Sequence, residues 1–332
     1  MNTQTQSLQN TTSALNALSI SPLLKAAADP LRLDILRALA TDSYGVTELC
    51  HLFQIKQSSM SHHLKVLATA GLVATRREGN SIFYLRNHAD QQDQLAPLQT
   101  TLHETIDKIP LQADLNVRIT DVHQQRAHAS QHFFAEHIGE FKEKQDLIAA
   151  YDVYADQVVE LLRSSPIPAY ENALEIGPGE GIFLRELATR FQQVAALDNS
   201  EAMLRAAQQF ADSKNLQNIH FHHNDSRFCT STGPIFDCAV INMVLHHTPS
   251  PAQMFADVST ALKPNAVLLV CDLCHHDQDW ARDACGDIWL GFDPQDLGRW
   301  ATDSGFLEGQ SVYFALRNGF QIQIRQFIKE QH

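Results

Sequence analysis

The chain has 332 residues, with 25 Lys and Arg against 38 Asp and Glu and a formal net charge of −13 at pH 7. The length exceeds what one hydrophobic core usually fills, so we expect about two domains, and the negative balance excludes a polyanion-binding surface over the whole molecule. No apolar stretch approaches the roughly 20 residues that span a bilayer, and six scattered cysteines form no disulfide framework, so we expect a reduced, cytoplasmic protein.

The charge is unevenly distributed along the chain. Residues 1–110 hold nine basic and nine acidic residues, whereas residues 111–332 hold sixteen and twenty-nine. Residues 1–20 are rich in Gln, Asn, Thr and Ser, without a basic start or an apolar block, so we predict a disordered tail and not a signal peptide or anchor. Residues 21–88 hold eight basic and five acidic residues, a modest excess that suits a small DNA contact.

A helix-turn-helix pattern follows the tail. Asp29 and Pro30 give an N-cap followed by proline at the first helical position, and leucines at helical spacing continue from there. Val46–Phe53 predicts a short helix, residues 54–57 a turn, and Ser58–Ala70 a longer helix. Short helix, tight turn and longer helix, in that order, indicate a helix-turn-helix.

The longer helix has a polar stripe from Ser58 to Lys65, at i, i+3, i+4 and i+7, which fits a DNA major groove. The alternative is an ordinary solvated face, since any amphipathic helix has a polar stripe. The hairpin predicted over residues 72–86 favours the DNA interpretation, because arginines near its tip suit backbone phosphates, as in a wing. The candidate DNA-binding residues are Gln57, Ser58, Ser59, Ser61, His62, His63, Lys65, Arg76 and Arg77.

The segment Leu24–Arg86 resembles the ArsR family of winged-helix repressors. The motifs that carry the resemblance are Ala28–Arg32, Gln57–Leu67, Ala70–Val73 and Arg76–Gly79. It implies a homodimer that reads an inverted repeat in double-stranded DNA and responds to an effector. The family's arsenic-type sensors have two cysteines in the helix before the recognition helix. Here the corresponding positions are Gly45 and Thr47, leaving only Cys50, so we do not predict metal sensing through that helix.

Residues 89–150 are predicted to form a helical connector that also serves dimerisation. Apolar residues recur there at three-, four- or seven-residue steps, which indicates packing more than a groove for a partner. His128 and His132 have the i, i+4 spacing of a metal pair, but no carboxylate or thiol completes a recognisable set. We therefore predict no metal site in this segment.

A strand-loop-helix-strand unit opens the second half of the chain. Ala173–Ile176 predicts a buried strand, Gly177–Gly181 a loop, residues 182–190 a helix, and Val194–Leu197 a second strand that ends at Asp198. Glycines allow a ligand to lie against the main chain, and an acid about 20 residues beyond the start of the loop suits two ribose hydroxyls. The spacing E-x-G-x-G-x-G differs from the pyrophosphate-binding G-x-G-x-x-G, so the pattern indicates a nucleoside pocket.

Further strands alternate with helices toward the C-terminus. The predicted strands are residues 219–222, 236–242, 266–272, 309–315 and 320–328. The last two read as an antiparallel hairpin on an otherwise parallel sheet.

This half resembles the class I S-adenosylmethionine-dependent methyltransferases. The motifs are Glu175–Gly181, Leu197–Asp198, Phe236–Asn242 and Leu262–Pro264. The implied fold class is α/β, a Rossmann-like seven-stranded methyltransferase fold after an N-terminal winged helix-turn-helix.

The methyltransferase resemblance implies a pocket for S-adenosylmethionine or S-adenosylhomocysteine. By it, Glu175 borders the methionine end, Asp198 holds the ribose and Asn242 closes the pocket. The implied cofactor-binding residues are Glu175, Gly177, Gly179, Gly181, Asp198, Asn199, Asn224, Asp225, Ser226 and Asn242. The alternative for Asp225 and Asn242 is ordinary loop capping.

No catalytic residue is identified. Methyl transfer from a sulfonium is an in-line displacement that needs proximity more than dedicated side chains, so the lack of an obvious base is uninformative. Acceptor-side candidates are His246, His247, Cys271, Cys274, His275, His276 and Cys285. The cluster from Cys271 to His276 suggests zinc or arsenic thiolates, but its first cysteine lies in an apolar strand, so we favour packed thiols and predict no metal.

The predicted domains are a disordered tail (1–20), a winged helix (21–88), a connector (89–150) and a methyltransferase-like domain (151–332). Such a fusion resembles S-adenosylhomocysteine-sensing regulators of methionine metabolism. We therefore expect a DNA-binding transcriptional regulator whose second domain binds S-adenosylmethionine or S-adenosylhomocysteine as effector. The alternative is an active small-molecule methyltransferase whose winged helix is autoregulatory or merely dimerising.

Overall fold

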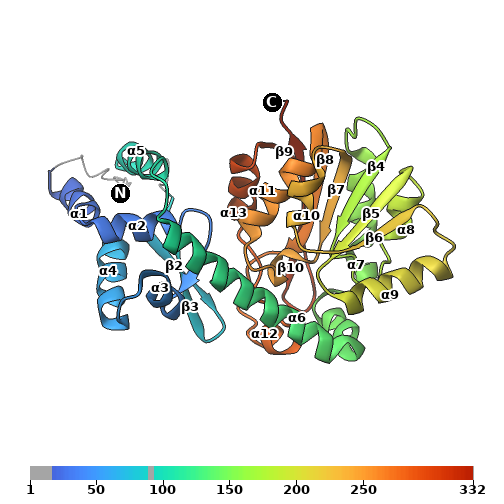
Figure 1. The fold of residues 1–332 in the computed structure, drawn as a ribbon, viewed down its shortest axis with the longest axis horizontal. Helices are drawn as coiled ribbons and strands as arrows, with labels where there is room; N and C mark the ends of the chain where they lie inside the picture. Colours follow the sequence, from blue (N-terminus) through green and yellow to red (C-terminus); the bar gives the residue numbers. More distant parts are fainter. Residues whose placement is uncertain (1–16, 89–92, 332) are drawn as a thin grey trace, which may run out of the picture. The chain divides into compact units, whose positions relative to one another are not determined.

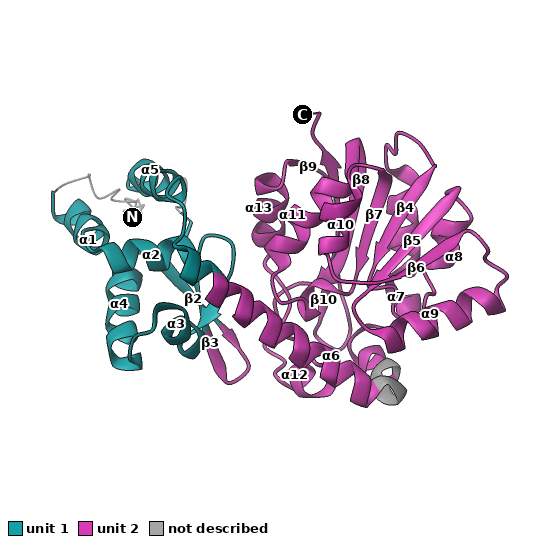
Figure 2. Cartoon of the chain, in the orientation of Figure 1, with its two compact units in different colours: residues 1–76, 83–116 teal, residues 77–82, 117–332 magenta. Residues whose placement is uncertain are grey.

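The computed structural model describes residues 17–88 and 93–331, which form two compact units (Figure 2). The first contains the chain up to Arg76 and residues 83–116, and the second contains residues 77–82 and the chain from Val117 onward. Of the predicted tail, residues 1–16 lie outside the described residues. The prediction of disorder is wrong for residues 17–20, which begin helix α1, a helix that buries Leu23 and Ala26.

The first unit contains the predicted helix-turn-helix and the wing hairpin except its residues 77–82, which belong to the second unit. Its elements are α1 (Ala17–Ala27), α2 (Pro30–Ala38), β1 (Tyr44–Gly45), α3 (Val46–Phe53), α4 (Gln57–Thr69), β2 (Val73–Glu78), β3 (Ser81–Arg86), α5 (Ala96–Asp107) and the start of α6 (Ala113–Ala149). The three strands form a sheet in the order β1-β3-β2. Helix α2 begins as predicted, because the Asp29 carboxylate accepts the Arg32 N–H at 3.1 Å and Pro30 follows the cap.

Helix α5 is held to the helix-turn-helix by a buried arginine. The Arg86 guanidinium donates to both oxygens of Asp107, at 2.8 and 2.6 Å, and its Nε donates to the Leu36 carbonyl at 3.0 Å. A bidentate pair of this kind fixes the position of both partners. Arg86 therefore serves the fold of the first unit.

The second unit is built on a seven-stranded sheet, as predicted (Figure 1). Its strands are β4 (Asn172–Ile176), β5 (Gln193–Asp198), β6 (Ile219–His223), β7 (Phe236–Asn242), β8 (Leu262–Leu273), β9 (Phe306–Ala315) and β10 (Gln321–Lys329). The strand order is β6-β5-β4-β7-β8-β10-β9. Strand β10 is antiparallel to both neighbours, whereas the other pairs are parallel, so the prediction of a final antiparallel hairpin is confirmed.

Helices cover both faces of this sheet. They are α7 (Tyr151–Ser164), α8 (Leu184–Ala188), α9 (Glu201–Ser213), α10 (Arg227–Thr232), η1 (Leu245–His247), α11 (Pro251–Ala261), α12 (Trp280–Cys285) and α13 (Pro294–Asp303). Successive strand residues point to opposite faces. Ala173, Cys238 and Val267 are in register and join the core that includes α7, α8 and α9. On the other face, the Phe255 ring of α11 packs at 5.6 Å from Phe327 of β10.

Helix α6 differs from the predicted connector. From Val117 onward it belongs to the second unit, although we expected residues 89–150 to form a separate segment. The physical reason is a set of contacts that sequence periodicity does not reveal. The Arg126 guanidinium lies 5.0 Å from the Trp289 ring and donates to the Pro249 carbonyl at 3.0 Å.

Among the described residues, no helix is both long and apolar enough to cross a membrane.

A buried carboxylate joins the amino-terminal ends of β4, β7 and β8. Asp237 is 1% exposed, and it accepts the N–H groups of Glu171 and Asn172 at 3.1 and 3.0 Å. The Lys263 ammonium donates to Asp237 at 2.8 Å and to Glu171 at 2.9 Å, where the Glu171 side chain is 57% exposed. One lysine thus pairs with a buried and an exposed carboxylate.

We predict that Asp237→Ala lowers the free energy of unfolding of the second unit by about 3 kcal/mol, because two backbone donors and an ammonium lose a buried acceptor. Glu171→Ala, which removes the exposed partner of the same lysine, is the matched control and changes it by less than about 1 kcal/mol. All three tryptophans lie in the second unit, so fluorescence-monitored urea unfolding measures both variants. Equal losses in the two variants would contradict this account.

Candidate functional site

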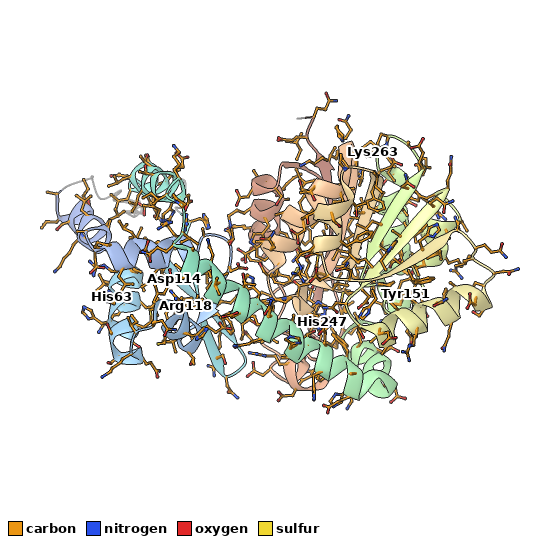
Figure 3. The ribbon with its side chains drawn as sticks, in the orientation of Figure 1. His63, Asp114, Arg118, Tyr151, His247 and Lys263 are labelled. Atoms are coloured by element: carbon orange, nitrogen blue, oxygen red, sulfur yellow. The ribbon has the colours of Figure 1, made fainter. Side chains whose placement is uncertain are left out.

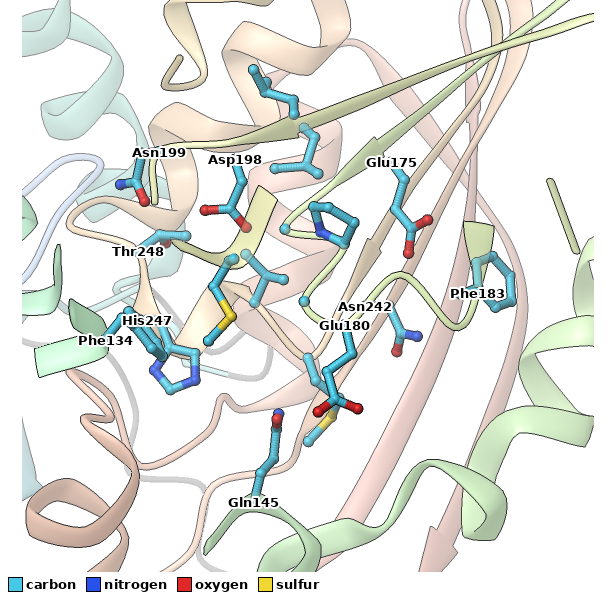
Figure 4. A pocket seen from close by; sticks show the side chains of 18 of the residues that line it. Phe134, Gln145, Glu175, Glu180, Phe183, Asp198, Asn199, Asn242, His247 and Thr248 are labelled. Atoms are coloured by element: carbon cyan, nitrogen blue, oxygen red, sulfur yellow. The ribbon is translucent and has the colours of Figure 1, made fainter. Parts of the chain in front are cut away.

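A cavity of about 300 Å³ opens at the carboxyl ends of β4, β5 and β7 (Figure 4). Ligands bind at this edge of open α/β sheets, because loops leave the strands there and expose main-chain groups. The predicted cofactor residues that line it are Glu175, Gly177, Gly179, Asp198, Asn199, Asn224, Asp225, Ser226 and Asn242. Gly181 is absent from the lining, so the structure brings together nine of the ten residues.

The three glycines of the loop after β4 have different roles. All have positive φ, of +66°, +55° and +81° for Gly177, Gly179 and Gly181. A Cβ at Gly177 would lie 2.4 Å from Cγ2 of Val244, and one at Gly181 would lie 3.0 Å from the Ala207 backbone. Nothing lies within 4 Å of a Cβ at Gly179. Gly177 and Gly181 therefore allow close packing, whereas Gly179 leaves space open beside the cavity.

Two side chains in the cavity wall have a buried oxygen atom without a hydrogen-bond partner among the described residues. The atoms are Oε2 of Glu175, at the end of β4, and Oδ1 of Asn242, at the end of β7. Burial raises the pKa of Glu175 to about 8, so its carboxyl group is mostly protonated at pH 7. Because buried polar groups are normally satisfied, these two atoms indicate a polar ligand.

Asp198 is the last residue of β5, and it lies across the glycine loop from Glu175 (Figure 4). Its Oδ1 accepts the Ser200 N–H at 2.8 Å, and its backbone carbonyl accepts the Asn224 N–H at 3.0 Å. Burial raises the pKa of Asp198 to about 6, although the Ser200 N–H and nearby His223 act in the other direction. The side chain is thereby fixed with acceptor capacity left for a ligand.

The loop after β6 is internally paired. Asp225 accepts the Arg227 N–H at 3.0 Å and pairs with its guanidinium, and hydrogen bonds from Arg227 lower the pKa of Asp225. The Ser226 hydroxyl donates to Asp257 at 2.5 Å. Asp225 therefore caps its own loop, which agrees with the alternative of ordinary loop capping. Among the described residues, the Asn242 Oδ1 atom accepts no such capping hydrogen bond.

Sequence reasoning missed the part of the cavity wall that comes from α6 and α7, together with Met203 of α9 and Thr248 after η1, whereas His247 was already an acceptor-side candidate. The missed lining residues include Ser130, Phe134, Gln145, Asp146, Tyr151, Tyr154, Met203 and Thr248. Phe134 and His247 meet edge to face, with ring centroids 5.0 Å apart (Figure 4). The i, i+3 spacing of Tyr151 and Tyr154 was the available signal, but it reads equally well as core packing.

The two histidines of η1 lie among buried carboxylates. His246 Nδ1 lies 2.7 Å from Oδ1 of Asp272, and its Nε2 lies 4.0 Å from Oδ1 of Asp287. Although burial acts in the other direction, Asp272 and Asp287 raise the pKa of His246 to about 9. Burial raises the pKa of Asp287 to about 7, and burial together with His246 holds the pKa of His247 well below its ordinary value.

The thiols of the second unit are packed, as the sequence interpretation favoured. Cys229, Cys238, Cys271, Cys274 and Cys285 are free and buried, whereas Cys50 in the first unit is half-buried. Burial raises the pKa of each of the six. Among the described residues, the group of side chains suited to holding a metal ion is His246, His247 and Asp287, and it contains no cysteine.

Helix α4 exposes most of the predicted DNA-binding residues. Gln57, Ser58, Ser59, Ser61, His62 and Lys65 are exposed. Met60, Leu64 and Leu67 are buried on the other face, and His63, labelled in Figure 3, is half-buried. In the hairpin, Arg76 is half-buried and Arg77 is exposed, and the Arg77 Nε donates to the Gly79 carbonyl at 2.9 Å. The predicted polar stripe is thus accessible on one helix face.

Comparison with known proteins assigns both parts of the chain. The methyltransferase domain model matches residues 124–307, and the model of the bacterial regulatory protein, arsR family, matches residues 29–75. The chain belongs to the methyltransferase-domain family and carries an ArsR-family helix-turn-helix domain at its N-terminus. It is therefore a DNA-binding regulator domain fused to a methyltransferase fold.

Individual relatives match one part each. An arsenical resistance operon repressor of Staphylococcus xylosus is 41% identical over 69 residues, which are 21% of this chain and 66% of that repressor. A ubiquinone biosynthesis O-methyltransferase of Coxiella burnetii is 23% identical over 168 residues, 46% of this chain and 71% of that enzyme. Among solved structures, the YcgJ protein of Bacillus subtilis covers 53% of this chain and 100% of its own, with 13% identity and a TM-score of 0.47.

We predict that Gly177→Ala destabilises the second unit by about 3 kcal/mol, whereas Gly179→Ala costs about 1 kcal/mol. Both alanines meet the strain of positive φ, and only the one at position 177 also overlaps Val244. Urea unfolding of the two variants measures the difference. A Gly179→Ala loss as large as that of Gly177→Ala would show that the open side of Gly179 is needed for folding itself.

Proposed function

We propose that the protein is a homodimeric transcriptional regulator that binds double-stranded DNA through α4 and the wing and takes S-adenosylmethionine or S-adenosylhomocysteine as effector. The cavity at the ends of β4 and β5 is the observation that carries the proposal. It joins main chain left bare by Gly179, a fixed carboxylate at Asp198, and the unpartnered acceptors of Glu175 and Asn242. The residues present fit a sulfur-containing adenine nucleoside.

The lining suggests how such a nucleoside is held. Asp198 accepts hydrogen bonds from the two ribose hydroxyls, and the segment Asn224–Ser226 borders the adenine. Glu175, Gly177 and Gly179 border the methionine part, whose ammonium group suits the Glu175 carboxylate. Asn242 closes the cavity. Gly181 acts indirectly, because its lack of a side chain brings the loop onto Ala207 of α9.

One helix supports a link between the cavity and the DNA-reading unit. Residues 113–116 of α6 belong to the first unit, and Ser130, Phe134, Gln145 and Asp146 of the same helix line the cavity. A ligand that contacts this helix face therefore acts on an element that both units share. The two nucleosides differ by one methyl group and one positive charge, and each tenfold difference in their affinity supplies about 1.4 kcal/mol to shift the DNA-binding state.

We predict that Asp198→Ala weakens S-adenosylhomocysteine binding at least about tenfold, because two hydrogen bonds to a charged acceptor are lost. Asp212→Ala, at an exposed position of α9, is the matched control and leaves the affinity unchanged. Isothermal titration calorimetry measures both. Failure of the wild-type chain to bind either nucleoside would refute the proposal.

DNA binding is tested with a duplex that the wild-type protein selects from a pool of random sequences. Lys65→Ala should weaken binding to this duplex and reduce the slope of log K against log salt by about 1, with nucleoside affinity unchanged. Asp198→Ala should keep DNA binding and lose its response to S-adenosylhomocysteine. Fluorescence anisotropy with and without each nucleoside gives both readouts. DNA affinity that is identical with either nucleoside and with none excludes the effector role.

The raised pKa of Glu175 predicts proton release on binding. At pH 7 the free carboxyl is mostly protonated, and pairing with the ligand's ammonium favours the ionised form, so binding expels a proton and strengthens as the pH rises toward about 8. Calorimetry at pH 7 in two buffers of different ionisation enthalpy measures the released protons. Glu175→Gln should abolish the difference between the buffers. Equal heats in both buffers for the wild type would contradict the contact.

A second candidate is an active small-molecule methyltransferase, favoured by His247 in the cavity wall. Its pKa is held well below the ordinary value, so the ring is neutral, and in the cavity wall it is placed to contact the molecule that would receive the methyl group. Incubation of the protein with methyl-labelled S-adenosylmethionine and a cell extract tests this. Labelled product without nucleoside-dependent DNA binding favours the enzyme over the regulator.

A further inference from the structure

Four ionisable side chains meet beneath the cavity wall in the second unit. His246 and His247 belong to η1, Asp272 lies near the end of β8, and Asp287 follows α12. His247, labelled in Figures 3 and 4, is also part of the cavity lining. His246, Asp272 and Asp287 are at most 3% exposed. His246, Asp272 and Asp287 have no part in the proposed binding of a nucleoside.

His246 is oriented by Asp272. The 2.7 Å contact between His246 Nδ1 and Asp272 Oδ1 fixes the ring, and the same oxygen accepts the Leu273 N–H at 2.7 Å. A proton on Nδ1 leaves the lone pair of Nε2 available. A carboxylate that holds one ring nitrogen while the other binds a metal ion is the usual support of metal-binding histidines.

Asp287 is placed between the two histidines. Its Oδ1 lies 4.0 Å from His246 Nε2 and 3.7 Å from His247 Nδ1. Its two carboxylate oxygens are buried and have no hydrogen-bond partner among the described residues. A buried carboxylate without hydrogen bonds is costly unless a cation lies beside it. The three potential ligand atoms are all within 4.8 Å of one another.

We propose that His246, His247 and Asp287 bind one divalent transition-metal ion of the zinc type, with Asp272 as the support of His246. Two imidazoles and one carboxylate are a ligand set that zinc favours. Ligand distances of about 2.1 Å with tetrahedral angles separate the ligand atoms by about 3.4 Å, so the 4.0 and 3.7 Å gaps from the two histidines to Asp287 close by less than about 1 Å.

Metal binding changes the surroundings of His247. Its Nδ1 now lies 3.3 Å from the Gly286 carbonyl, a contact that the metal ion replaces. Three protein ligands leave a fourth position, as in catalytic zinc sites, for a water molecule or for an oxygen or sulfur atom of a small molecule in the cavity. The competing arrangement has a proton in place of the metal, with a charged His246 between two carboxylates.

The test uses the full chain, freed of metal with a chelator and then titrated with Zn²⁺ and, separately, with Co²⁺. One equivalent of Zn²⁺ per chain is expected, and Co²⁺ should give the intense visible absorption of a tetrahedral site. Asp287→Asn and His247→Gln should each weaken Zn²⁺ binding at least about a hundredfold, and Asp272→Asn about 10- to 100-fold. His275→Gln and Asp277→Asn are matched controls, because that exposed pair, 3.9 Å apart, contains the same residue types nearby.

The outcomes separate the metal from its alternatives. Stoichiometric Zn²⁺ uptake that is lost in the ligand variants and kept in the controls supports the site. Uptake that survives both Asp287→Asn and His247→Gln places the ion on other histidines and overturns the proposal. Absence of uptake by the wild type, with a charged His246 visible by NMR, favours the proton and also overturns it. If a variant fails to fold by circular dichroism, the Co²⁺ spectrum of the wild type still decides, since an octahedral spectrum contradicts the three-ligand site.

Discussion

The left-handed turn at Gly177 is the constraint on which the candidate site depends. The Gly177 N–H donates to the Leu197 carbonyl at 2.8 Å, and the absent side chain allows Val244 to pack directly against the loop. Strands β4, β5 and β7 therefore end around one space, and the side chains at those ends line a common cavity. A side chain at this turn would push the segment before η1 away from the loop, and with it the two histidines of η1 away from the cavity.

Features that depend on local physics could be read from the sequence. The Asp29 cap, the positions of α3 and α4, and the strand Phe236–Asn242 follow from hydrogen bonding or side-chain periodicity within a few residues. The same holds for the glycine loop and the acid at position 198, because a strand, a turn and a helix have characteristic lengths. Nine of the ten predicted pocket residues line the cavity for this reason.

Features that depend on contacts distant in sequence could not be read in this way. Helix α6 has a polar composition typical of a connector, and contacts such as the stacking of Arg126 on Trp289 and the edge-to-face contact of Phe134 with His247 show where it packs. The same applies to Gly181, whose neighbour Ala207 lies in α9, beyond α8 and β5 in the sequence. The contacts of His246 with Asp272 and Asp287 join η1, strand β8 and the segment after α12, which are distant in sequence, so no spacing rule predicts them.

The distribution of the thiols provides a single site for chemical labelling of the native chain. Five cysteines are enclosed in the second unit, and Cys50 alone is half-buried, on α3, the helix that precedes α4. Maleimide-type reagents attack the thiolate and need access to it, so labelling under native conditions is selective for Cys50 and fastest at alkaline pH. A fluorophore attached there sits beside the recognition helix without any substitution. The unmodified sequence thus supplies its own probe of how that helix responds to small molecules.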